Sequence, residues 1–256
     1  MKYFAIALVA SVLGSALCAS IEDRSQSGNG RVLDLVKAAF SYASKVASKW
    51  DPIPLSDLYE NHSTGSDPQY DLVITQLNRK IAGVANVSLE NIETDDVALT
   101  AKFLVVNPEI QFNSDYYEVF GTALNRNVSG SGPFRSRFMN VTALFSVRFE
   151  EDPSTKALSI PSLSELYNIS SVVVDLANIQ VEGVTKEETE AYVEKEVLKY
   201  FYANKGNFEK FFPEVLRQEL NDEMYGMTMA EVTQWLKENT PKLSSAAILK
   251  ALGLNV

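Results

Sequence analysis

Apolar residues along the chain follow a helical spacing, then a spacing of two, and then a helical spacing again. Between residues 30 and 50 they recur every three or four positions, which predicts a helix that Asp51-Pro52-Ile53-Pro54 ends. From 70 to 182 they alternate with polar residues, which predicts a run of antiparallel strands. From 185 to 252 the helical spacing returns, so the order is helix, strands, helices.

The last region has one apolar stripe, which begins at Val193, Val197 and Phe201. Gly206 and Pro213 are expected to break or kink the helix there. Shorter helices are predicted at 228–238 and 243–252. The glutamates around 187–196 alternate with lysines, so a solvated helix face is the preferred interpretation.

The stretch 138–149 is the clearest predicted strand, and the 125–133 segment is expected to form a glycine-containing hairpin turn before it. Side chains alternate along a strand. If Asn140 faces solvent, one apolar row must face the interior. That row is Met139, Val141, Ala143, Phe145 and Val147.

Helices that flank a long antiparallel run place the chain in the α+β class. A strongly curved sheet cannot bury its concave face alone, and an apolar helix lying in it is one solution. We therefore expect a curved antiparallel sheet wrapped around a long C-terminal helix.

The first 19 residues have the features of a secretory signal peptide: Lys2, then an uncharged run from Tyr3 to Leu17, then small residues. Residues 20–256 are then expected to be a single domain, secreted and extracellular. Cys18 is the only cysteine, so cleavage beyond it leaves a mature chain with no disulfide. No later stretch has the length of a transmembrane helix.

Five acceptor triplets for N-linked sugar follow the predicted signal peptide. Modification of some of them is expected because the chain is predicted to be secreted. Their asparagines are Asn61, Asn86, Asn127, Asn140 and Asn168.

Charge and residue usage argue against several functions. The net charge of −10 disfavours nucleic acid as a partner. His62 is the sole histidine, so typical zinc sites and nucleophilic triads have too few residues to form. No phosphate-binding or dinucleotide-binding motif occurs. We expect no catalytic residues, no metal and no cofactor, and therefore no enzyme; protein partners are unspecified.

Four blocks, in this order and spacing, resemble the insect takeout and haemolymph juvenile-hormone-binding protein family, and mite group 7 allergens share parts of the pattern. The blocks are Leu77 to Leu89, Val106 to Tyr116, Gly130 to Phe134 with Phe138 to Val141, and Asp175 to Val184. The resemblance covers roughly 70–225. It implies an elongated fold of the tubular lipid-binding type, in which the sheet and a long helix enclose a hydrophobic tunnel.

One departure separates the chain from takeout-type proteins, which usually carry two cysteines near the mature N-terminus. This chain has none there. The departure argues against the hormone-binding branch specifically and favours a divergent or allergen-like branch.

These observations together predict a secreted carrier of a small hydrophobic ligand such as a terpenoid, a fatty acid or a related lipid. The tunnel lining is predicted to combine the 139–147 row with Val193, Val197 and Phe201. One alternative is a secreted structural or interaction protein with the same fold and a closed tunnel. Another is an innate-immune binder of microbial lipid.

Overall fold

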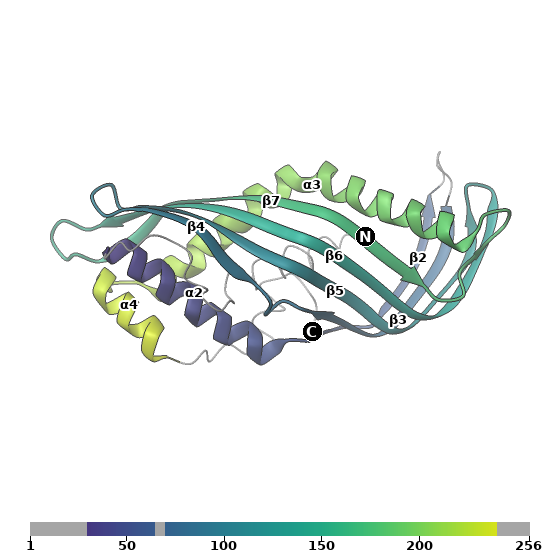
Figure 1. Cartoon of the computed structure of the whole chain (residues 1–256), viewed down its shortest axis with the longest axis horizontal. Helices are drawn as coiled ribbons and strands as arrows, with labels where there is room; N and C mark the ends of the chain where they lie inside the picture. Colours follow the sequence, from purple (N-terminus) through teal and green to yellow (C-terminus); the bar gives the residue numbers. More distant parts are fainter. Residues whose placement is uncertain (1–29, 65–69, 240–256) are drawn as a thin grey trace.

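A computed structural model describes residues 30–64 and 70–239 (Figure 1). The predicted signal peptide and the helix expected at 243–252 lie outside the described residues. The elements in chain order are α2 (Arg31–Trp50), β1 (Ile53–Leu55), β2 (Leu58–Thr64), β3 (Tyr70–Ala82), β4 (Ser88–Asp95), β5 (Thr100–Ala123), β6 (Arg126–Glu151), β7 (Leu158–Leu176), β8 (Gln180–Val181), α3 (Lys186–Glu223) and α4 (Met229–Glu238).

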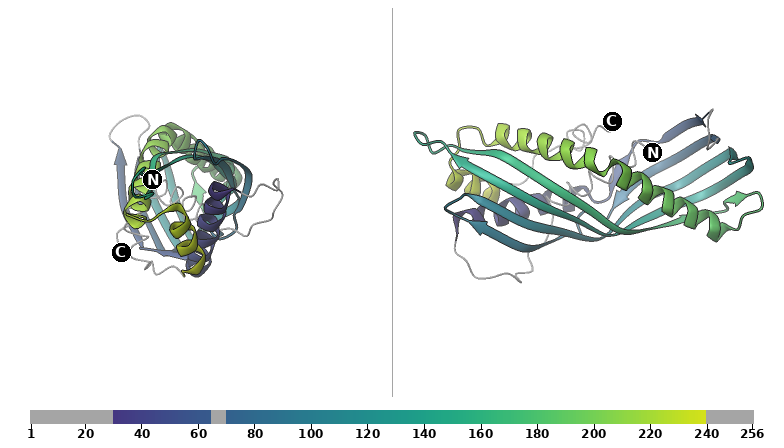
Figure 2. Two further views of the ribbon diagram at one scale, coloured as in Figure 1. Left: turned by 90° about the vertical axis from the view of Figure 1, so that its left-hand side faces the viewer. Right: turned by 90° about the horizontal axis from the view of Figure 1, so that it is seen from above.

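One antiparallel sheet runs the length of the molecule, as Figures 1 and 2 show, and it does not close into a barrel. Its main strand order is β1-β3-β5-β6-β7, with β2 paired to β3, β4 to β5 and β8 to β6. The three longest strands, β5, β6 and β7, have 24, 26 and 19 residues, and β7 lies at one edge of this order. Helices cover the sheet, so the fold is α+β, as the sequence predicts.

At one level across three strands, the buried positions switch between odd-numbered and even-numbered residues, and we call this the parity change. Pro108 on β5, Asn140 on β6 and Ser170 on β7 lie at this level, and buried residues alternate in opposite phase before and after it. Asn140 has φ +48°, a left-handed conformation that asparagine adopts more readily than most residues. Such a residue rotates the side chains that follow it and adds local twist, which curves the sheet.

The hairpin before β6 differs from the prediction. The turn lies at Leu124 and Asn125, which both have positive φ (53° and 61°), as a tight two-residue hairpin requires. Gly130 and Gly132 lie inside β6 instead. A Cβ on Gly130 would lie 2.7 Å from the Tyr117 hydroxyl oxygen, so the glycine serves close packing rather than chain reversal.

At one end of the molecule α2 and α4 pack against each other and lie under the sheet (Figure 1). The inner face of α2 is apolar and buried, and it includes Val32, Val36 and Phe40. A capping box formed by Thr228 and Glu231 begins α4.

The long helix α3 lies beside β7 over most of the length of the molecule (Figure 2). A capping box of Thr185 and Glu188 begins it. The expected break is wrong, because the helix continues through both Gly206 and Pro213. Contacts with β7 on both sides of the proline, through Glu209 and Asn221, hold the helix against the strand and offset the lost backbone hydrogen bond.

Candidate functional site

The predicted apolar row of β6 lies mainly on the inner face of the sheet. Val141, Ala143, Phe145 and Val147 are buried in one hydrophobic core. Met139 is a correction: it is only half-buried, and the neighbouring Phe138 takes the inner position. The cause is the parity change at Asn140, which strict alternation does not anticipate.

The three predicted residues of α3 also meet this core. Phe201 is buried, whereas Val193 and Val197 are partly buried and pack against the core. The structure does not gather all the predicted residues into one pocket. Glu194, next to Val193, contacts Val174 of β7, while Ala143 pairs with Tyr167 further along the same strand. The predicted lining is therefore spread along the length of the molecule.

Two polar residues of β7 lie within this apolar interior, and the sequence analysis missed both. Glu165 pairs with Phe145 across the strands, and Tyr167 pairs with Ala143. Their side chains are 1% and 2% exposed. The sequence did contain a signal, because Glu165 occupies the apolar phase of a strand that continues with Tyr167 and Ile169.

Burial controls the protonation of this pair. Loss of solvation raises the pKa of Glu165 to about 8; the Tyr167 hydroxyl lowers it in part, and the charge of Glu209 raises it. The pKa of Tyr167 is also raised, first by burial and then by the charge of Glu165. At neutral pH Glu165 is therefore mostly an uncharged carboxylic acid that can both donate and accept a hydrogen bond.

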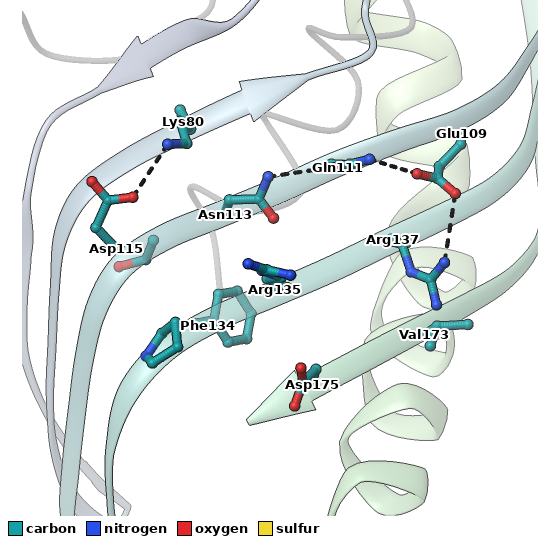
Figure 3. A pocket seen from close by; sticks show the side chains of 12 residues that line it. Lys80, Glu109, Gln111, Asn113, Asp115, Phe134, Arg135, Arg137, Val173 and Asp175 are labelled. Atoms are coloured by element: carbon teal, nitrogen blue, oxygen red, sulfur yellow. Dashed lines mark hydrogen bonds and ion pairs between the residues drawn. The ribbon is translucent and has the colours of Figure 1, made fainter. Parts of the chain in front are cut away.

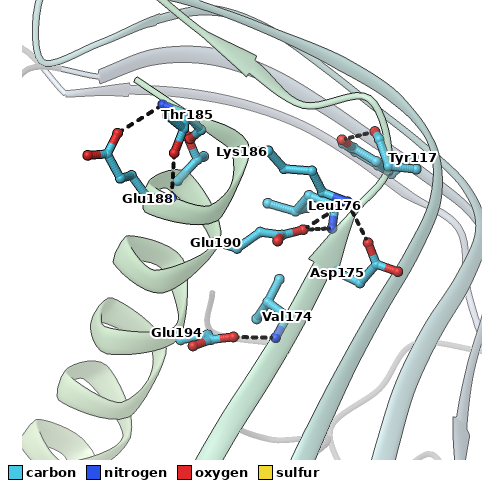
Figure 4. A network of polar contacts seen from close by, with 11 residues as sticks. Tyr117, Val174, Asp175, Leu176, Thr185, Lys186, Glu188, Glu190 and Glu194 are labelled. Atoms are coloured by element: carbon cyan, nitrogen blue, oxygen red, sulfur yellow. Dashed lines mark hydrogen bonds and ion pairs between the residues drawn. The ribbon is translucent and has the colours of Figure 1, made fainter. Parts of the chain in front are cut away.

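The free edge of β7 is covered by side chains of α3, and Figure 4 shows the end of this contact near the start of the helix. Glu190 accepts a hydrogen bond from the Leu176 N–H (2.8 Å), and Glu194 accepts one from the Val174 N–H (2.9 Å). Further along, Glu209 accepts from the Tyr167 N–H at 3.0 Å.

An exposed strand edge is a template for unwanted pairing, and this arrangement protects it. The interpretation of the glutamates as a solvated helix face is therefore wrong for Glu190 and Glu194. Their acceptor role depends on β7, which adjoins the helix only in the folded chain.

Replacing Glu194 with leucine is expected to lower the free energy of unfolding by about 1–2 kcal/mol, because the Val174 N–H loses its acceptor. Glu196→Leu is the matched control on the same helix. Among the described residues, Glu196 forms an ion pair with Lys199 alone (3.2 Å), near the surface, so its loss should change little. Urea unfolding of both variants measures the difference, and equal effects would contradict the edge-protection role.

The outer face of the sheet carries a groove of about 590 Å³, and its lining is mostly polar and charged, unlike the apolar interior (Figure 3). Polar side chains bridge one another along β5: Asn113 donates to Gln111 (3.2 Å), and Gln111 donates to Glu109 (2.6 Å). Lys80 pairs with Asp115 at 3.2 Å. A groove with balanced charges and amide bridges does not match an apolar ligand, so the interior is the better candidate site.

The asparagines of all five acceptor triplets lie on the surface, as attachment of a sugar requires. Two of them contact other side chains: Asn127 donates to Glu182 (3.1 Å), and Asn168 accepts from the Tyr202 hydroxyl (3.1 Å). Which of the five carries a glycan stays a prediction.

The described residues offer no metal site, since nowhere in 30–64 or 70–239 do three His, Cys, Asp or Glu side chains gather suitably. None of the helices in the same ranges combines the length and hydropathy that crossing a membrane needs.

Comparison with solved structures finds 23 similar chains, and two of them illustrate the match. Takeout 1 of Epiphyas postvittana aligns with a TM-score of 0.33 and 15% identity, over 74% of this chain and 81% of that chain. A lipopolysaccharide binding protein aligns with a TM-score of 0.32 and 13% identity, over 75% of this chain but only 37% of that chain. No curated protein matches the sequence.

Comparison with family models gives the assignment. The model of the haemolymph juvenile hormone binding protein (JHBP) family matches residues 47–234, well over half of the chain. The matched range contains every strand of the sheet, together with α3 and most of α4. The chain therefore belongs to the haemolymph juvenile hormone binding protein family.

Proposed function

We propose that the protein is a secreted carrier of a small hydrophobic ligand, which it binds between the inner face of the sheet and the helices. The observation that carries the proposal is the mostly apolar inner face of an unclosed sheet, which runs on β6 from Phe134 to Val147 and is interrupted there by the buried Ser136. Membership of a family named for binding a hormone supports the same class of ligand.

The energetics suit such a carrier without a charged anchor. Burying ten methylene groups contributes roughly 8 kcal/mol at about 0.8 kcal/mol each. Association costs of about 4 kcal/mol or more reduce this gain. The remaining gain of about 4 kcal/mol corresponds to a Kd of about 1 mM, so micromolar affinity needs roughly 4 kcal/mol more, from a larger apolar ligand or from hydrogen bonds to its head group.

Packing of the described interior favours a second candidate, a secreted structural or interaction protein with a closed interior. Ala143, Phe145 and Tyr167 are at most 2% exposed, so a ligand must displace side chains in order to enter. The two candidates differ in one observable property, which is the presence of bound lipid.

Native mass spectrometry of the secreted protein from its own source tests the proposal. We expect a non-covalent adduct with the mass of a terpenoid or a fatty-acid-sized lipid, which organic solvent removes. The same spectra test whether the secreted protein carries N-linked glycans. The protein mass should be lower after treatment with peptide-N-glycosidase than before it. Protein without an adduct, which also fails to take up added lipid, would support the closed alternative.

A further inference from the structure

Glu165 and Tyr167 leave polar atoms unsatisfied in the packed interior. Neither carboxyl oxygen of Glu165 has a hydrogen-bond partner among the described residues, and the same holds for the Tyr167 hydroxyl. The two side chains are neighbours on one face of β7 and lie close enough that each shifts the pKa of the other, but no hydrogen bond of good geometry joins them. Buried polar atoms in native proteins are nearly always paired, so this cluster requires an explanation.

Among the described residues, the neighbouring strand and helix supply no partner. Across the sheet, Glu165 faces Phe145 and Tyr167 faces Ala143, neither of which has a polar side-chain atom. From α3, Glu209 directs one oxygen to the Tyr167 N–H (3.0 Å) and pairs with Lys205 at 3.5 Å. The positive charge of Lys205 is therefore already neutralised, and no described cation shifts the pKa of Glu165.

We propose that Glu165 and Tyr167 bind the head group of the ligand, and that this head group is the hydroxyl of a long-chain or terpenoid alcohol. The inference rests on the proposed function, since it names the ligand class for the same interior site. The apolar chain of the alcohol would lie along the inner face beside Phe145.

The chemistry of the two residues selects a hydroxyl over other head groups. A hydroxyl both donates and accepts, so it can donate to Glu165 and accept from Tyr167 at once. A carboxylate would place a second negative charge near Glu209, in a site without a free described cation. A head group that cannot donate would leave an acceptor of Glu165 unpaired.

Competition experiments test the head-group preference. The full-length secreted protein, freed of lipid, is loaded with the fluorophore N-phenyl-1-naphthylamine at pH 7. The fluorophore is then displaced with 1-dodecanol, dodecanoic acid or 1-chlorododecane, which share a chain length. The wild type should bind dodecanol about tenfold more tightly than the other two, because one good hydrogen-bonded pair has roughly that effect.

Variants connect the preference to the site. Glu165→Leu should bind dodecanol and chlorododecane with similar affinity, while Glu165→Gln, whose amide both donates and accepts, should keep most of the preference. Tyr167→Phe removes only the hydroxyl and should weaken dodecanol binding alone. Glu118→Leu is the matched control, because Glu118 is exposed on β5.

The outcomes separate this inference from the proposed function. A wild type that binds all three compounds equally, or a Glu165→Leu protein that keeps the preference, would overturn the head-group assignment and leave the carrier function intact. A wild type that takes up neither the fluorophore nor any of the compounds would refute both. If Glu165→Leu does not fold, the Tyr167→Phe and Glu165→Gln proteins still decide the question.

Discussion

Replacing Ala143 with tryptophan is expected to abolish binding of an apolar fluorophore and to lower the melting temperature. Ala143 is fully buried and lies between Val105 on β5 and Tyr167 on β7. An indole at this position must occupy the volume that a ligand would take. It also overpacks its neighbours, at a typical cost of about 1–3 kcal/mol in the free energy of unfolding.

Thr142→Trp is the control for this experiment, because Thr142 is the adjacent residue on the opposite side of β6 and is only half-buried. It should change neither property much. Fluorophore titration and thermal melting are measured on both variants and on the wild type. Normal binding by Ala143→Trp together with lost binding by Thr142→Trp would mean that the ligand lies on the outer face.

Replacing Glu165 with glutamine is expected to make the protein more stable than the wild type at pH 8, but not at pH 4. Burial raises the pKa of Glu165 from its ordinary value near 4.5 to about 8. Below pH 4.5 the carboxyl is protonated in both the folded and the unfolded chain. Above it the unfolded chain loses the proton first, so the free energy of unfolding of the wild type falls as the pH rises.

The difference between wild type and Glu165→Gln should therefore grow by roughly 1.4 kcal/mol per pH unit from about 4.5 to 8 and then level off. The groups that act on Glu165, namely Tyr167, Glu209 and its partner Lys205, are unchanged in the variant, so their own titration largely cancels. Urea unfolding at several pH values gives the curve. A constant difference across this range would show that Glu165 is ionised in the folded protein.

Local patterns in the sequence predicted much of the fold. The spacing of two gave the antiparallel sheet, and the helical spacing gave α2 and the two helices that follow the sheet, because these periods arise from backbone geometry. Gly130 and Gly132 were misread as a turn, since glycine also suits a strand that approaches a neighbour closely. Asn125 was the stronger turn signal, because asparagine adopts a positive φ more readily than most residues. The positive φ at Leu124 could not be predicted from the sequence, because leucine rarely adopts it.

Long-range partners account for what the sequence did not reveal. Met139 seemed to belong to the inner row because a single left-handed residue, Asn140, shifts the alternation without interrupting the pattern. Glu190 and Glu194 resembled surface glutamates because the backbone N–H groups that they bind belong to β7. Pro213 did not break α3 because contacts with the same strand hold the helix on both sides.

Photo-crosslinking with a diazirine-bearing long-chain alcohol tests the central claim most directly, because it locates the ligand on the chain. The claim is that an apolar ligand lies on the inner face of the sheet, beside the buried residues of β6 and β7. The labelled residues should then include Phe145 and Tyr167, and excess unlabelled alcohol should prevent the labelling. Labelling confined to the outer groove, at residues such as Gln111 and Arg135, would contradict the account, and so would labelling that unlabelled alcohol does not reduce.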